Sequence, residues 1–209
     1  MSKSRIDLTK VSYTHLSTDE IFFRGTARSD SQSEENRPFS QGIYVSNDAY
    51  VGCVYSDHKD QNLQQFKLVH STIVFNVTWK NIHILLHTLK HMRDPLVLRN
   101  GVQLQASEAA TIITNYCSFT PNVHQPLVID TGSGKYITLK DVTNYQGHWF
   151  AHIICFFGFQ GYRVGMWYKR KENDYMFHPE FYFCYPRVQL KATRAVSNVC
   201  IPPPPPVVT

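Results

Sequence analysis

The stretch Gln41-Gly42-Ile43-Tyr44-Val45-Ser46-Asn47-Asp48-Ala49-Tyr50-Val51-Gly52-Cys53-Val54-Tyr55 combines a short apolar strand with the start of a helix. In its first part, Tyr44 and Ser46 alternate with two aliphatic residues, so a strand would place them together on one face. Asn47 and Asp48 both belong to the residue types that cap helix N-termini. The stretch therefore predicts a strand, a tight turn and a helix of small residues.

Two tyrosines of this stretch are candidates for a ligand site. On the predicted helix, Val51 and Tyr55 share a face because they are four residues apart. If Tyr44 points from the strand toward that face, the two tyrosine rings flank a slot, which suits a flat aromatic ligand. The alternative is that both tyrosines belong to the hydrophobic core.

The composition indicates a folded protein. Of the 209 residues, 43% are hydrophobic and 18% are charged, and the net charge is +5. This mild basicity would help an anionic ligand to bind, but it does not by itself indicate nucleic-acid binding, because there is no arginine-rich stripe. No apolar run has the length of a membrane span. The basic residues 1–5 are not followed by the apolar region of a secretory signal.

The cysteines are expected to be reduced. They are odd in number and widely spaced, and the sequence has no CxxC pair. We therefore expect buried thiols in a reducing compartment. The five positions are Cys53, Cys117, Cys155, Cys184 and Cys200.

His83, His87 and His91 recur at every fourth position of a predicted helix, so they would share one face. Three such histidines could bind a metal ion. A solvated helix face is favoured instead, because no cysteine or carboxylate has matching spacing nearby. We therefore predict no metal site.

Alternation and apolar periodicity predict the remaining elements. Strands are expected at 21–26, 66–79, 161–168 and 180–185. Helices are expected at 81–92, 106–117 and 148–158. Residues 131–135, which contain two glycines, are expected to form a hairpin turn rather than a phosphate-binding loop.

Three segments resemble the ADP-ribosyltransferase family. In its poly(ADP-ribose) polymerase and diphtheria-toxin branch, the first strand ends in His-Gly-Ser or His-Gly-Thr, and Arg24-Gly25-Thr26 stands in that place here. The branch's Gly-Ile-Tyr-Phe-Ala/Ser motif and second tyrosine are similar to Gly42-Ile43-Tyr44-Val45-Ser46 and Tyr55. Its Glu-Tyr-x-Val-Tyr strand is similar to Glu180-Phe181-Tyr182-Phe183, behind Gly161-Tyr162-Arg163-Val164.

The sequence departs from both branches of the family. Arg24 replaces the histidine and is similar to the first residue of the arginine–serine–glutamate toxin branch, whose Ser-Thr-Ser strand is missing here. His178 occupies the position two before Glu180, where that branch often has the Glu or Gln that selects the acceptor. The acceptor therefore cannot be inherited from either branch.

The resemblance implies an α+β fold with a split central sheet over residues 1–200. It also implies an inserted helical subregion at 81–117 and a loop at 27–38 that could fold over the site. Residues 201–209 form a proline-rich tail, expected to be disordered, and Pro202 to Pro206 could bind a proline-recognition module.

The resemblance also assigns roles to residues. NAD⁺ would lose nicotinamide through an oxocarbenium-like transition state, which the carboxylate of Glu180 would stabilise. Tyr44 and Tyr55 would stack on nicotinamide. Its amide would hydrogen-bond to the Gly25 backbone with help from Thr26. Arg24 would pair with the pyrophosphate or brace the Glu180 strand. Cofactor-binding roles also fall to Gly42 and Ser46, as residues of the second motif.

The sequence therefore predicts an NAD⁺-dependent ADP-ribosyltransferase that modifies a protein or another macromolecule, one unit at a time. One alternative is an NAD⁺ glycohydrolase. Others are a non-catalytic binding module on the same fold and an unrelated interaction protein that acts through its tail. A cytoplasmic enzyme, a viral protein and a toxin or effector delivered by dedicated export are equally compatible with the sequence.

Overall fold

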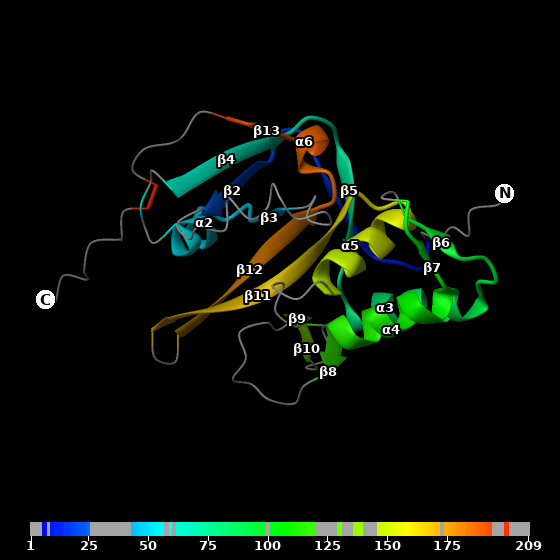
Figure 1. Ribbon diagram of the computed structural model, residues 1–209. Helices are drawn as coiled ribbons and strands as arrows, with labels where there is room; N and C mark the ends of the chain where they lie inside the picture. The colour runs from blue at the N-terminus through cyan, green and yellow to red at the C-terminus, as the bar shows by residue number, and fades with distance from the viewer. Residues whose placement is uncertain are drawn as a thin grey trace, which may run out of the picture.

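The chain adopts a mixed α+β fold with several sheets and, among the described residues, five helices (Figure 1). Four predicted features lie outside the residues whose structure is described: Thr26, Gly42, the 27–38 loop and the proline-rich tail. The computed structural model describes residues 6–7, 9–25, 43–56, 59, 62–98, 101–119, 129–130, 136–139, 146–171, 174–193 and 199–200.

A five-stranded sheet forms the centre of the molecule, in the order β1-β5-β11-β12-β3. Its neighbours are antiparallel except for β5 and β11, which are parallel. Strands β11 and β12 form a long hairpin (Figure 1). The strands are β1 (Tyr13–Leu16), β3 (Ile43–Val45), β5 (Thr72–Asn76), β11 (Gly161–Lys171) and β12 (Asp174–Phe183).

A second, three-stranded sheet has the order β13-β4-β2. A single antiparallel bridge between Phe23 of β2 and Ser46, directly after β3, joins it to the central sheet. The predicted α+β class is therefore confirmed at the coarse level of a mixed fold with several sheets. The strands are β2 (Ile21–Gly25), β4 (Leu63–Leu68) and β13 (Leu190–Ala192).

Three helices cover one face of the central sheet (Figure 1). They are α3 (Trp79–His91), α4 (Ala106–Tyr116) and α5 (Gln146–Phe156), close to their predicted bounds. Apolar side chains at helical spacing on α3 and α4 are buried in this core, as expected: Ile82, Leu85, Leu89, Ala109 and Ile113. The other face of the sheet packs against the second sheet through Phe22, Val45, Phe181 and Phe183.

The remaining elements are short. Helix α2 (Ala49–Tyr55) packs on the outer side of the second sheet (Figure 1). Strands β9 and β10 pair antiparallel on either side of residues 131–135. The hairpin turn predicted there lies outside the described residues and stays a prediction. The others are β6 (Leu96–Val97), β7 (Gln103–Leu104), β8 (Cys117–Phe119), β9 (Ile129–Asp130), β10 (Tyr136–Leu139) and α6 (Pro186–Gln189).

Local sequence explains where the helices begin and end. The side chain of Asp48 accepts a hydrogen bond from the Tyr50 amide, so of the two predicted cap residues Asp48 is the one that caps α2. Thr78 caps α3 in the same way by accepting from the Asn81 amide. After α5, Gly158 has a φ of +98°, a conformation that glycine adopts without strain.

The prediction of a single strand over 66–79 is wrong. The structure has two strands there, β4 and β5, in different sheets. A turn separates them at 69–71, where Val69 and His70 are exposed. Strand β1 was not predicted at all, because residues 1–20 are largely polar. It pairs with β5 at the edge of the central sheet. Of its four residues only Leu16 is buried; Tyr13 and His15 are exposed and Thr14 is partly buried.

The prediction of reduced cysteines is also wrong. The structure pairs Cys53 with Cys200 and Cys155 with Cys184, with Cα atoms 5.3 Å and 6.8 Å apart. Disulfides persist in oxidising environments, whereas the sequence led us to expect a reducing compartment. The sequence could not show this pairing because 147 positions separate the first two partners. The Cys117 side chain lies outside the described residues.

Candidate functional site

Glu180 lies in the middle of β12 and is only 4% exposed. Its neighbour Tyr182 belongs to the core beneath the helices, so alternation along the strand places Glu180 on that same face. Burial raises the pKa of the Glu180 carboxyl to about 8. In the free protein at neutral pH this carboxyl is therefore mostly protonated.

Ser46 lies beside Glu180. The register of β12 and β3 pairs Phe181 with Val45, so the next position brings Glu180 opposite Ser46. The Ser46 hydroxyl donates to the carbonyl of Pro179 at 2.7 Å and accepts from the Asp48 amide at 3.1 Å. These bonds fasten the backbone before Glu180 to the turn that starts α2. In this structure Ser46 is thus engaged in holding the two motifs together.

Tyr44 is held by two buried tyrosines from neighbouring strands. Tyr44, Tyr182 and Tyr162 occupy one row across β3, β12 and β11. The Tyr162 and Tyr182 rings stack at 5.1 Å, and the Tyr44 ring meets both edge-on. The hydroxyl groups of Tyr44 and Tyr162 are hydrogen-bonded. This packing fixes the Tyr44 ring on the face that carries Glu180.

Gly25 and Tyr55 meet where β2 contacts the end of α2. A Cβ atom on Gly25 would overlap the backbone of Tyr55, Ser56 and Gly52, so only glycine allows this approach. The Tyr55 side chain is 49% exposed, whereas Val51 on the same helix is buried. The structure thus brings Gly25 and Tyr55 together and leaves much of the Tyr55 ring accessible to a ligand.

Arg24 is half-buried at the end of β2, opposite Gln64 of β4. Alternation places its side chain on the same side of the strand as Phe22. The Phe22 ring meets Phe181 at 5.4 Å, so this side faces the residue next to Glu180. Of the two expected roles of Arg24, bracing of the Glu180 strand fits this position.

The backbone segments that carry the predicted site residues lie side by side, but the Arg24 side chain is on the face opposite Glu180, because it shares the side of Phe22 in the core between the two sheets. The bridge between Phe23 and Ser46 places the first motif beside the second, and the pairing of β3 with β12 places the second beside the third. Thr26 and Gly42 are outside the described residues, and their places in the site stay predictions.

The three helix histidines are exposed, as favoured by the sequence. The His87 and His91 rings stack at 4.4 Å, and His83 meets the Trp79 ring. Within the described part of the chain, no group of three His, Cys, Asp or Glu residues is arranged to hold a metal ion. In the same residues, no helix has the length and apolarity needed to span a bilayer.

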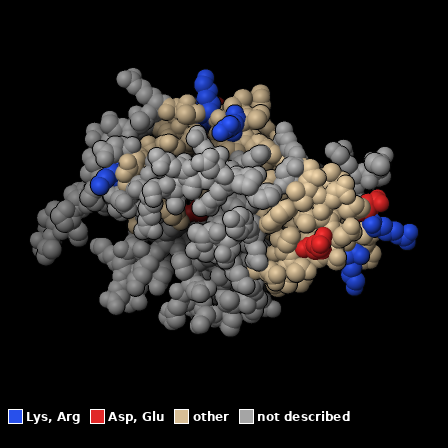
Figure 2. Space-filling model, viewed as in Figure 1, with Lys and Arg blue, Asp and Glu red and all other residues tan. Residues whose placement is uncertain are grey.

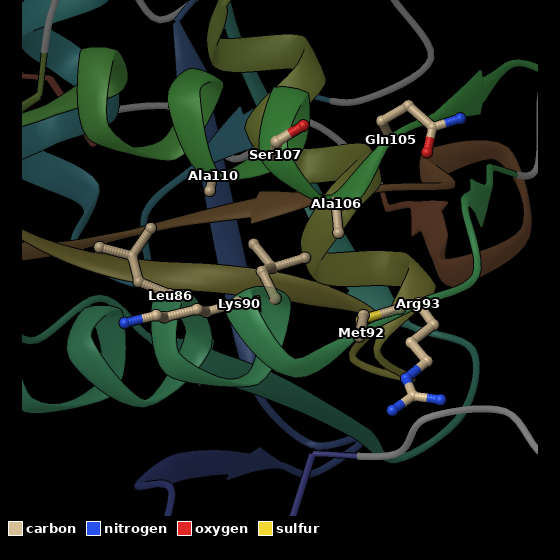
Figure 3. Close-up of a pocket in the computed structure, with 9 residues that line it drawn as sticks. Leu86, Lys90, Met92, Arg93, Gln105, Ala106, Ser107 and Ala110 are labelled. Atoms are coloured by element: carbon tan, nitrogen blue, oxygen red, sulfur yellow. The ribbon is translucent and has the colours of Figure 1, made fainter.

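Two surface features do not belong to this site. A groove between α3 and α4 contains none of the predicted site residues (Figure 3). Its lining is Leu86, Leu89, Lys90, Met92, Arg93, Gln105, Ala106, Ser107 and Ala110. Figure 2 shows the described lysines and arginines of one face at the top, the left and the right of the view rather than in one stripe.

Sequence reasoning missed Tyr162 and Tyr182 as residues that hold the site. Tyr162 stood in a motif of the resemblance, but it was given no role. A usable signal was present, because a tyrosine occurs on each of three predicted strands. The row that they form depends on the order and register of those strands, which composition does not show.

Comparison with known proteins gives no relative. No family model matches the chain, and neither a curated protein nor a solved structure is significantly similar to it.

Proposed function

We propose that the protein is an NAD⁺-dependent ADP-ribosyltransferase that transfers a single ADP-ribose unit to a macromolecule, with a protein as the expected acceptor. The observation that carries the proposal is the adjacency of Glu180 on β12, Ser46 directly after β3, and Phe23 on β2. The three segments that resemble the family are distant in sequence, and a chance resemblance gives no reason for them to be adjacent. The finer fold assignment, a split-sheet ADP-ribosyltransferase domain, is part of this proposal.

Glu180 is the proposed charge-stabilising residue. As the bond to nicotinamide breaks, positive charge develops on the ribose, and an ionised carboxylate that accepts from the 2′-hydroxyl stabilises it. Because burial raises the pKa of Glu180, the active ionised form increases as the pH approaches 8. The positively charged nicotinamide ring of bound NAD⁺ would favour ionisation further.

Tyr44, Tyr55 and Gly25 form the proposed nicotinamide pocket. The Tyr44 ring is fixed by Tyr162 and Tyr182, so its stacking surface is organised before the ligand arrives. Tyr55 is accessible enough to add a second ring. The Gly25 backbone, with Thr26 after it, would hydrogen-bond the nicotinamide amide. Arg24 braces β12 in this scheme.

The disulfides bear on where the protein acts. Delivery into another cell by a dedicated export route would expose the chain to an oxidising exterior, where Cys53–Cys200 and Cys155–Cys184 can form. We therefore propose an exported effector rather than a resident cytoplasmic enzyme.

Nicotinamide release from labelled NAD⁺ tests the function. Wild type, Glu180→Gln and the control Glu108→Gln are assayed at about pH 7 and about pH 9, with and without cell lysate. Glu108 is an exposed helix-start residue on α4, and glutamine can still accept from the Gln105 amide. We expect Glu180→Gln to lose on the order of 10² or more in rate. Glu108→Gln should match wild type.

The lysate arm separates the alternatives. Label transferred to a lysate component supports the transferase and gives the acceptor's size. Release without transfer supports the glycohydrolase. One further candidate is a binding module that does not turn over NAD⁺. The raised pKa of Glu180 favours it, because a protonated carboxyl does not stabilise the positive charge on the ribose. No release at either pH from folded protein would overturn the enzymatic proposal and leave that candidate.

A further inference from the structure

The central sheet carries a half-buried arginine on the face opposite Glu180. Arg163 lies on β11 between Tyr162 and Val164, and both neighbours are buried beneath the helices. Alternation therefore places Arg163 on the other face. Its register partner on β12 is Phe181, which belongs to the core between the two sheets. Arg163 thus lies at the border of that core.

No counter-charge is described for this arginine. Among the described residues the only ion pair is Lys10 with Asp7, far from Arg163 in the chain. Desolvation lowers the pKa of the Arg163 guanidinium. A partly desolvated cation without a carboxylate is unfavourable unless an anion binds to it.

Asn76 supplies further donors beside Arg163. Parallel pairing of β5 with β11 places Asn76 directly next to Arg163, on the same face. The Thr14 hydroxyl of β1 donates to the Asn76 Oδ1 atom at 2.6 Å. Strand β5 lies between β1 and β11, so the amide oxygen is turned toward β1. The planar amide then directs its NH₂ group toward the Arg163 side.

We infer that Arg163 and Asn76 form a binding site for a phosphate group. The guanidinium offers two parallel N–H donors to two oxygens, and the Asn76 NH₂ group offers a donor to a third. A phosphate has at least three acceptor oxygens and uses all of these donors, whereas the guanidinium alone satisfies a carboxylate. The site does not depend on the proposed NAD⁺ chemistry, because the sheet separates it from Glu180.

Titration of the full chain with inorganic phosphate, without NAD⁺, tests this inference. The Arg163 Nε resonance is followed by NMR in protein labelled at arginine, and Arg163→Lys assigns it. We expect saturable shifts and affinity for phosphate at least about tenfold above that for acetate. O-phosphoserine distinguishes the source: tighter binding than inorganic phosphate indicates a phosphate ester, and equal binding indicates the free ion.

Three variants complete the test. Calorimetry with phosphate should show at least about a tenfold loss of affinity in Arg163→Gln and in Asn76→Asp, which places a negative charge at the site. Arg187→Gln, an exposed arginine on α6, should bind like wild type. Should Arg163→Gln fail to fold, Arg163→Lys still tests the site, because it keeps the charge but loses the bidentate fork.

The inference is overturned by any of three results. The first is no saturable phosphate binding by folded wild type. The second is unchanged affinity in the folded Arg163 variants. The third is acetate binding as tightly as phosphate, which would leave a general anion site and not a phosphate site.

Discussion

The hydroxyl groups of Tyr44 and Tyr162 are hydrogen-bonded across β12, the strand that separates their own. Tyr162 is fully buried, and its ring stacks on Tyr182, so it forms a rigid support for Tyr44. In the proposed site this bond orients the ring that contacts nicotinamide.

A double-mutant cycle tests that bond. Tyr44→Phe and Tyr162→Phe should each lower the free energy of unfolding by about 1 kcal/mol, because each leaves the other hydroxyl without this partner. The double variant should lose less than the sum, with a coupling of about 1 kcal/mol in urea denaturation. Tyr13→Phe, at a tyrosine that is 44% exposed, is the control. Strictly additive losses would contradict the pairing.

Glu180 should make the stability of the protein pH-dependent. Its folded-state pKa of about 8 exceeds the ordinary value of 4.5, so the folded state holds a proton that the unfolded state has released. The stability that this group contributes is complete below about pH 4.5 and is lost as the pH rises through about 8. Between these values the free energy of unfolding should fall by about 1.4 kcal/mol per pH unit.

Urea denaturation from about pH 4 to about pH 9 measures this slope. Glu180→Gln should remove it, because the amide does not titrate, and Glu108→Gln should keep it. An identical slope in wild type and Glu180→Gln would show that other groups cause the dependence.

Activity should have the opposite pH dependence. If ionised Glu180 stabilises the ribosyl cation, kcat/KM for nicotinamide release reports the free-enzyme pKa and should rise to a plateau above about pH 8. Initial rates at low NAD⁺ concentration measure this profile. A plateau already reached near pH 5 would mean that the essential group has an ordinary carboxyl pKa, and that Glu180 is not that group.

Gly25 should tolerate no side chain. In Gly25→Ala the new Cβ atom meets the backbone of Tyr55 and Ser56, which cannot rotate away, so we expect a loss of about 1–3 kcal/mol in the free energy of unfolding. Gly101→Ala is the matched comparison, because Gly101 has open space around it but a φ of +82°. Its cost should be about 1–2 kcal/mol from backbone strain alone. Thermal and urea denaturation compare the two, and wild-type stability in Gly25→Ala would contradict this packing.

The two disulfides should contribute unequally to stability. Their sequence separations are 147 and 29, and loop closure in the unfolded chain then corresponds to about 5 and about 3.5 kcal/mol. Cys53→Ser/Cys200→Ser should therefore destabilise more than Cys155→Ser/Cys184→Ser in urea denaturation. Mass spectrometry of non-reduced digests checks the pairing, and any other linkage would contradict the structure.

The sequence predicted the local structure well where neighbouring residues decide it. The Asp48 cap, the apolar stripe of α3 and the glycine after α5 each depend on contacts within a few positions. Strand alternation also assigned Tyr44 and Ser46 to one face. Prediction failed at 66–79, because the short turn at 69–71 lies between two β-branched and aromatic segments that read as one continuous strand, and only their pairing with different sheets separates them.

The sequence predicted which residues belong to the candidate site, and only the tertiary structure gave their positions relative to one another. By itself the sequence determined that Glu180, Tyr44, Gly25 and Arg24 stand at strand ends or within strands. The structure decided that β12 pairs with β3, that Ser46 bridges to Phe23, and that Cys53 meets Cys200. The physical reason is that burial, and the hydrogen bonds that join strands, act between residues far apart in the chain. These long-range interactions set the strand register, bring the disulfide partners together and raise the pKa of Glu180.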